Sequence, residues 1–268
     1  MNSHIDAKRG QGIDEVIAKL HPAPLEDIKK LTVLNPPDYA PLFQVYEQML
    51  SFSAGGMRSK GLELQAANAF GIAELISDVL SPLQIQGILQ STIAHENHQN
   101  YRAVTGIFVT RLIQNSFNAG YNYFVLHVPS EKEHRLHYLG SKLEGRSGQR
   151  VSLAVEGDVG MNFCWKTRYC NVVSHGNARL GYGEGAQESR FEHYGNSIYP
   201  AKNCTHCEFV FHGGIECFKL GPRVTQNTLF KTSNNDTLEL LLQTIPHDKG
   251  NKIYFIDEYG KAILRRDT

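Results

Sequence analysis

The sequence has no excess of charge of either sign. Its 27 lysine and arginine residues balance 27 aspartate and glutamate residues. Proteins that bind nucleic acid usually carry net positive charge or a concentrated stripe of lysine and arginine, and no such stripe is visible here. The composition therefore predicts that nucleic acid is not a partner.

Long apolar runs are also missing. One of the most apolar segments, Leu238–Leu242, is far shorter than the roughly 20 residues that a helix needs to cross a bilayer. The first residues, Met1–Asp6, lack the charged and then apolar regions of a secretory signal peptide. We therefore expect no membrane partner and no secretion.

Cysteine is scarce and irregularly spaced. The five cysteines are an odd number, and all of them lie between Cys164 and Cys217. Without a signal-peptide pattern, such a set is typical of reduced thiols, which predicts a cytoplasmic location. A chain of 268 residues is also long enough to bury a core without disulfides or metal.

Residues 1–118 have the pattern of a helical region. Leu42, Val45, Tyr46 and Met49 follow the i, i+3, i+4, i+7 spacing of one helix face. Ser81-Pro82 combines a favourable N-cap with a proline in the first turn. The pattern predicts helices over residues 14–20, 25–34, 41–52, 62–80, 82–98 and 104–117.

Residues 119–268 change to short apolar segments rich in β-branched and aromatic residues, and Tyr123–Val128 is the first predicted strand. Four later segments each end in a glycine, at steps of 19, 19 and 18 residues: Gly157, Gly176, Gly195 and Gly213. A period near 19 is typical of one coil of a parallel β-solenoid, with glycine supplying the left-handed backbone of each corner. The sequence therefore predicts an α+β fold, in which a helical N-terminal region precedes a parallel β-helix with a C-terminal cap.

The same register predicts which side chains fill the bore of the solenoid. One inward ladder would contain Leu153, Val172, Phe191, Phe209 and Leu229, and a second would contain Val155, Ser174, His193 and Phe211. We expect Thr237–Thr244 to lie across the open end of the solenoid, where strand edges need covering. A final hairpin is predicted over residues 254–257 and 262–264.

The glycine pattern resembles a known family. Val155–Gly160, Ser174–Ala178, the glycines Gly181, Gly183 and Gly185, and Tyr194–Ser197 resemble the GXGXG-type right-handed β-helix. That domain closes the large subunit of glutamate synthase and makes up much of one of the subunits of formylmethanofuran dehydrogenase. The likeness covers residues 150–221, and Ile198-Tyr199-Pro200 departs from it. The resemblance implies a structural and docking role without catalytic residues.

One group of residues has the chemistry of a metal site. Cys204 and Cys207 form a Cys-x2-Cys pair, and His212 and Cys217 follow closely. Thiolates in this spacing are typical zinc ligands, although the second pair of a strong zinc motif is missing. The alternative is that these cysteines are small buried hydrophobic residues of the solenoid.

A second group lies just before the corner glycines. Glu156, His175, Tyr194 and His212 should align on one face, at about the 4.8 Å spacing of neighbouring strands. Such a polar ladder could bind a metal or an anion, or transfer protons. The alternative is an outward polar row beside the turns.

No complete catalytic signature is present. His95–His98 lacks the spacing of a zinc protease, and Leu180–Ala186 is not followed by the helix of a phosphate-binding loop. We therefore expect a non-catalytic scaffold or accessory protein that uses a solenoid face to bind a protein partner or its own copies. The alternative is a metal-binding protein or an enzyme that uses the solenoid His and Cys groups near the helical region. Zinc is the one cofactor that the sequence suggests.

Overall fold

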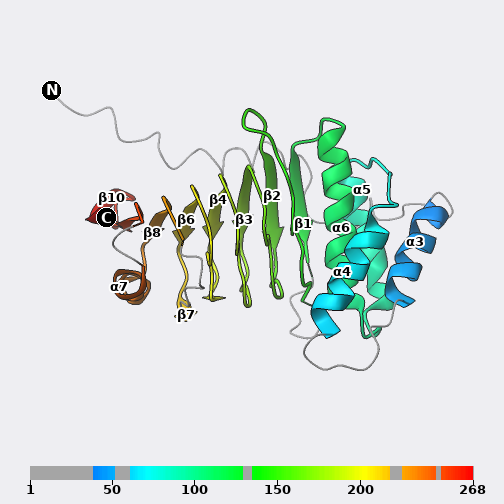
Figure 1. Ribbon diagram of the computed structural model, residues 1–268, viewed down its shortest axis with the longest axis horizontal. Helices are drawn as coiled ribbons and strands as arrows, with labels where there is room; N and C mark the ends of the chain where they lie inside the picture. The colour runs from blue at the N-terminus through cyan, green and yellow to red at the C-terminus, as the bar shows by residue number, and fades with distance from the viewer. Residues whose placement is uncertain (1–38, 52–60, 129–134, 218–224, 246–248, 268) are drawn as a thin grey trace. The chain divides into compact units, whose positions relative to one another are not determined.

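The computed structural model in Figure 1 describes residues 39–51, 61–128, 135–217, 225–245 and 249–267. This part of the chain forms one compact unit, with helices first and a parallel β-solenoid after them. The predicted fold class is therefore confirmed. The helices predicted over residues 14–20 and 25–34 lie outside the described residues.

The helical region is built around one central helix. Its elements are α3 (Ala40–Ser51), α4 (Gly61–Ala73), α5 (Pro82–Ser91), the 3-10 helix η2 (Thr92–His95) and α6 (Tyr101–Asn118). Helix α6 is buried along most of its length and contacts α3, α4 and α5. No helix in the described part of the chain is long and apolar enough to cross a membrane. The helices and the solenoid share one continuous apolar core, and the domain boundary at residue 118 stays a prediction.

Helix α5 begins where the sequence predicts. The Ser81 hydroxyl accepts a hydrogen bond from the Gln84 backbone amide at 3.3 Å, and the Gln84 side chain accepts one from the Ser81 amide at 2.8 Å. This reciprocal capping box satisfies two amides that a helix start leaves without partners. The helix ends at Ser91, before the predicted end near residue 98.

Helix α4 is shorter than predicted, because it ends at Ala73 and not near Leu80. Side chains of α6 bind the backbone of the segment that follows it. Asn115 donates to the Ile76 carbonyl at 2.8 Å, and the Leu80 amide donates to the Ser116 hydroxyl at 3.0 Å. These contacts replace the intrahelical hydrogen bonds that another turn would have made.

The solenoid stacks parallel strands into one sheet of order β1-β2-β3-β4-β6-β8-β9-β10. Pairing is parallel from β1 to β9 and antiparallel between β9 and β10. A short parallel pair, β5 with β7, forms part of a second side of the coils. The strands are β1 (Tyr123–His127), β2 (Val151–Glu156), β3 (Cys170–Ser174), β4 (Arg190–His193), β5 (Ser197–Ile198), β6 (Glu208–Phe211), β7 (Ile215–Cys217), β8 (Leu229–Thr232), β9 (Lys252–Ile256) and β10 (Ala262–Asp267).

The first predicted inward ladder is present in the bore, except for its last member, Leu229. Leu153, Val172, Phe191 and Phe209 pair across successive strands and are almost fully buried. The rings of Phe191 and Phe209 stack with their centres 4.6 Å apart. The prediction for Leu229 is wrong, because Phe230 pairs with Phe209 while Leu229 pairs with Glu208 on the outer side.

This register error has a simple origin. The predicted ladder placed Leu229 20 residues after Phe209, but the residue that pairs with Phe209 is Phe230, which lies 21 residues after it. Because successive strand residues face opposite sides, an odd error in coil length exchanges inside for outside.

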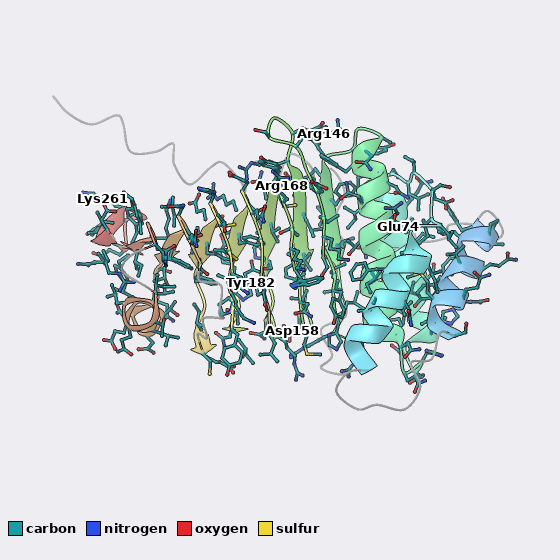
Figure 2. The ribbon with its side chains drawn as sticks, in the orientation of Figure 1. Glu74, Arg146, Asp158, Arg168, Tyr182 and Lys261 are labelled. Carbon is teal, nitrogen blue, oxygen red and sulfur yellow. The ribbon has the colours of Figure 1, made fainter. Side chains whose placement is uncertain are left out.

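The second inward ladder is confirmed. Val155, Ser174, His193 and Phe211 occupy equivalent positions of β2, β3, β4 and β6, and all four are buried. Tyr182, whose position Figure 2 marks, lies beside this ladder and is fully buried. The bore is therefore lined by both aromatic and polar side chains.

The predicted corner glycines occupy close approaches between coils. A Cβ atom on Gly176, Gly195 or Gly213 would collide with the backbone of the preceding coil. Of the four predicted corners, Gly157 has a positive φ, of 105°, while the other three do not. The left-handed backbone expected at every corner is therefore wrong for three of them, where the restriction is space.

The left-handed residues lie instead in the turns between the strands of the large sheet, which we call the turn side of each coil. Gly181, Gly183 and Gly185 have φ between 64° and 81° at alternate positions. The coil before them has positive φ at Asn162, Cys164 and Lys166, although none of these is glycine. The coil after has the same feature at Tyr199, Ala201 and Asn203. Alternate left-handed residues are thus a property of the coil shape.

The C-terminal cap differs in part from the prediction. Helix α7 (Asn235–Thr244) is capped by Asn234, whose side chain accepts a hydrogen bond from the Thr237 amide. The helix contacts β7, β8 and β9. The sheet edge that we expected this helix to cover is paired with strand β10. The predicted hairpin is therefore present and supplies the last strand of the sheet.

Candidate functional site

Three predicted ladder residues form a stack of rings on the outside of the sheet. His175, Tyr194 and His212 each follow the last residue of their strand, so the parallel register places them in line. The His175 and Tyr194 ring centres are 4.7 Å apart and nearly parallel, and those of Tyr194 and His212 are 4.3 Å apart. We call these three residues the ring strip.

The ring strip is accessible and not part of the core. Tyr194 is 42% exposed, His175 is exposed and His212 is half-buried. The rings are held at the ends of hydrogen-bonded strands, because the Tyr194 amide donates to the Ser174 carbonyl and the His212 amide donates to the His193 carbonyl. The hydrogen bonds between neighbouring coils therefore fix where the backbone of the strip lies.

Glu192 joins two of the three rings. One of its carboxylate oxygens accepts a hydrogen bond from the Tyr194 hydroxyl at 2.8 Å and lies 3.3 Å from His212 Nε2. Because an ionised carboxylate only accepts hydrogen bonds, His212 Nε2 must carry the hydrogen of this contact. The hydrogen bond from His212, reinforced by the one from Tyr194, lowers the pKa of Glu192.

The fourth predicted ladder residue has a different partner. Glu156 lies 3.3 Å from Nδ1 of His127, which pairs with it across β1 and β2. The predicted ladder of Glu156, His175, Tyr194 and His212 is therefore divided into the ring strip and a separate contact between Glu156 and His127.

The buried polar residues behind the strip support the fold. His193 Nδ1 lies 2.8 Å from the Ser174 hydroxyl, and that hydroxyl lies 3.3 Å from the Tyr182 hydroxyl. Burial lowers the pKa of His193 to about 4, while the backbone of Asn196 opposes part of that shift. His193 is therefore a neutral core histidine at pH 7.

Of the four predicted metal ligands, the structure brings Cys204 and Cys207 together, with a hydrogen bond between their side chains. Cys204 and Cys207 are buried, Cys217 is exposed at the end of β7, and His212 belongs to the ring strip. The Cys204 thiol donates to the Gly183 carbonyl at 2.9 Å, and burial raises its pKa. Among the described residues, no group of three or more His, Cys, Asp or Glu side chains is placed to hold a metal ion.

Sequence reasoning missed two residues of this surface. Glu192 lies two residues before Tyr194, and the two-residue period of a strand places both side chains on the same face. His127 precedes the regular repeat, since 29 residues separate it from Glu156. The alternation of side chains along a strand was enough to predict that Glu192 lies on this surface. The glycine period could not predict the position of His127, because His127 lies before the period begins.

No protein-family model, curated protein or solved structure matched the chain in comparison. A proposal about its function therefore depends on the chain's own geometry.

Proposed function

We propose that this protein is a non-catalytic scaffold or accessory protein, which binds another protein or a second copy of itself through the ring strip. The stacked rings of His175, Tyr194 and His212, of which the first two are exposed and the third is half-buried, carry this proposal. Tyrosine is among the side chains enriched at protein interfaces and among the residues that dominate binding energy.

The stack also lowers the entropic cost of association. Ordering one flexible side chain at an interface costs roughly 0.5–1.5 kcal/mol of binding free energy, because the side chain loses conformational freedom. Tyr194 is already fixed between two rings and by its hydrogen bond to Glu192. A partner would therefore meet a surface whose geometry is set before binding.

Charged residues of both signs surround the strip on the outer face of the sheet. Arg190 lies 3.7 Å from Glu192 and 3.9 Å from Glu208, and Lys231 lies 2.7 Å from Glu208. An aromatic centre with a mixed-charge rim has the composition of a reversible protein interface. This arrangement favours a folded protein as partner over a polyanion.

The likeness to the GXGXG-type β-helix supports the same role. Gly181, Gly183 and Gly185 supply alternate left-handed positions within one coil. In that family the domain is a structural and docking element, and we extend the role to this chain as part of the proposal. We also place the protein in the cytoplasm, in accord with its unpaired cysteines.

Site-specific photocrosslinking tests the proposal. A photoreactive phenylalanine derivative replaces His175 in one protein and Tyr259, which is 86% exposed in the β9–β10 turn, in a control protein. Both are irradiated as purified protein and in an extract of cells that produce the chain. We expect a discrete adduct from position 175 alone, and its mass distinguishes a second copy from another protein.

A second substitution checks that the adduct depends on the strip. Adding Tyr194→Ser should abolish the adduct at position 175 without unfolding the protein, because Tyr194 is largely outside the core. Equal adducts from positions 175 and 259, or no adduct from either, would contradict the proposed association.

The alternative function, a metal-binding protein or an enzyme, was predicted for a site near the helical region. A pocket is present at that junction, but basic and aromatic side chains line it where histidines and cysteines were expected. The chemistry of that pocket suggests a different use.

A further inference from the structure

A pocket of about 530 Å³ lies between helix α4 and the turn side of the solenoid. The helix contributes an apolar wall and four coils contribute polar and aromatic residues. Its lining residues are Ala66, Ala67, Phe70, Tyr138, Lys142, Asn162, Trp165, Glu184 and Lys202. No residue of the ring strip lines this pocket, so it is separate from the proposed association surface.

A second hollow of about 440 Å³ extends the same surface. It shares Lys142, Trp165 and Glu184 with the pocket and adds Lys166 and Arg168. Arg168 lies on the coil that leads into β3, as Figure 2 shows. Together the two hollows bring basic side chains around the tryptophan.

The basic side chains are only partly neutralised by carboxylates. Lys202 lies 3.0 Å from Glu184, and Arg168 lies 3.8 Å from Glu144. Within the described part of the chain, Lys142 and Lys166 have no carboxylate within ion-pair distance.

Aromatic rings position these two ammonium groups. Lys142 Nζ lies 4.1 Å from the centre of the Phe70 ring, and Lys166 Nζ lies 4.3 Å from the centre of the Trp165 ring. A ring face attracts an ammonium group without taking up its hydrogen-bond donors as a carboxylate would. Both lysines therefore keep donors for a ligand.

Both lysines lie at left-handed positions of the coil turns. Lys142 and Lys166 have φ of 61° and 55°, a left-handed conformation that costs a residue with a side chain roughly 1–2 kcal/mol. The equivalent position of the next coil is Gly185, and that of the coil after is Asn203; glycine and asparagine are the residues that best tolerate this backbone. The same conformation occurs at other non-glycine residues of the coils, such as Tyr138, Cys164 and Ala201, so it is a feature of the turns.

Glycine also shapes the floor of this surface. Gly185 follows Lys166 in the column and has no side chain, so a Cβ there would press against the Lys166 stem at 3.1 Å. The absence of a side chain at Gly185 therefore leaves space for the Lys166 stem, and Gly185 itself lines the second hollow.

We propose that the pocket and the adjoining hollow, which share Lys142 and Trp165, together bind an organic anion, a carboxylate or a phosphate monoester attached to an apolar body. Lys142 and Lys166 would bind the anionic group through charge-assisted hydrogen bonds. The apolar body would lie against Phe70 and the alanines of α4. This activity is additional to the proposed scaffold role and does not depend on it.

The pocket contains its own reporter, because Trp165 is the only tryptophan of the chain. Its fluorescence is followed while octanoate, octyl phosphate, inorganic phosphate or neutral octanol is added to the full-length protein. We expect saturable changes with octanoate or octyl phosphate and a much smaller change with octanol. The tighter of the two anions identifies the preferred head group, and calorimetry checks each affinity.

Substitution of the lysines identifies the site. Lys142→Gln and Lys166→Gln should each raise the dissociation constant about tenfold, as expected for the loss of one charge-assisted hydrogen bond. Lys261→Gln is the matched control, because Lys261 is an exposed lysine of the β9–β10 turn (Figure 2). Binding should also weaken as ionic strength rises.

Three results would overturn the proposal. They are equal binding of octanol and the anions, unchanged affinity in both lysine variants, and no saturable binding of any probe up to its solubility limit. Because both lysines are exposed, circular dichroism should show that the variants fold normally. Failure of this test leaves the crosslinking result at His175 unaffected.

Discussion

The carbonyl oxygen of Gly176 occupies the space that a Cβ atom on residue 195 would need. The same relationship joins Gly157 to Gly176 and Gly195 to Gly213. At these corners successive coils approach more closely than any side chain permits. The glycine period therefore reflects direct contact between coils.

Gly195→Ala should destabilise the protein by roughly 1–3 kcal/mol, the usual cost of forcing an extra methyl group into a packed site. Gly148→Ala is the matched control, because a Cβ at Gly148 meets no atom within 4 Å. Urea unfolding measures both variants. Equal stability of the two variants would show that the coils can separate at no cost.

Two buried histidines should make the protein sensitive to mild acid. Burial lowers the pKa of both His137 and His193 to about 4, and Arg102 and Arg179 reinforce the shift at His137. The unfolded chain, with histidine pKa values near 6.5, then binds more protons than the native state below that pH. The stabilisation is complete above about pH 6.5 and is lost as the pH falls towards 4.

The expected loss between pH 6 and pH 5 is about 2 kcal/mol for the two histidines together. Urea unfolding at several pH values measures it, in a window above the titration of ordinary carboxylates. His193→Gln should remove about half of this dependence. Stability that is constant from pH 7 to pH 5 would contradict the assignment of neutral, buried histidines.

The capping box of α5 gives a local test of the helical region. Ser81→Ala removes the hydroxyl that accepts the Gln84 amide and should cost about 1 kcal/mol. Ser51→Ala is the control, since the Ser51 hydroxyl is exposed and donates to the Gln48 carbonyl three residues earlier. Thermal or urea unfolding measures the stability of both variants. A larger loss of stability in Ser51→Ala than in Ser81→Ala would contradict the capping assignment.

The cysteine pair separates a zinc site from a packed core. Cys204 is fully buried and donates to the Gly183 carbonyl, so Cys204→Ala should lower stability by about 1–3 kcal/mol through lost packing and an unpaired acceptor. A chelator should leave the unfolding midpoint of the unsubstituted protein unchanged. A lowered midpoint after chelation, with release of zinc, would support the predicted metal ligands instead.

Much of the architecture was predictable from the sequence because two signals are local. The apolar spacing of Leu42, Tyr46 and Met49 and the Ser81-Pro82 start predicted helices that are present. The glycine steps up to Gly213 predicted coils that pair in the expected register through β6. Each signal needs only a few neighbouring residues or one constant period.

The errors arise where distant residues compete with local preference. Helix α4 ends early because Asn115 and Ser116 of α6 bind the segment after it. The position expected for Leu229 belongs to Phe230, because this coil is one residue longer than predicted. The local sequence of α4 does not reveal the contacts that end it, and the local sequence of β8 does not reveal its register.

The candidate sites show the same division. The sequence by itself determined that His175, Tyr194 and His212 share one column, because a constant coil length aligns them. Only the tertiary structure decided that their rings stack outside the sheet while Cys204 turns inward. It alone also brought Phe70 of α4 beside Lys142, since contact between a helix and a coil far apart in the chain depends on packing and follows no period.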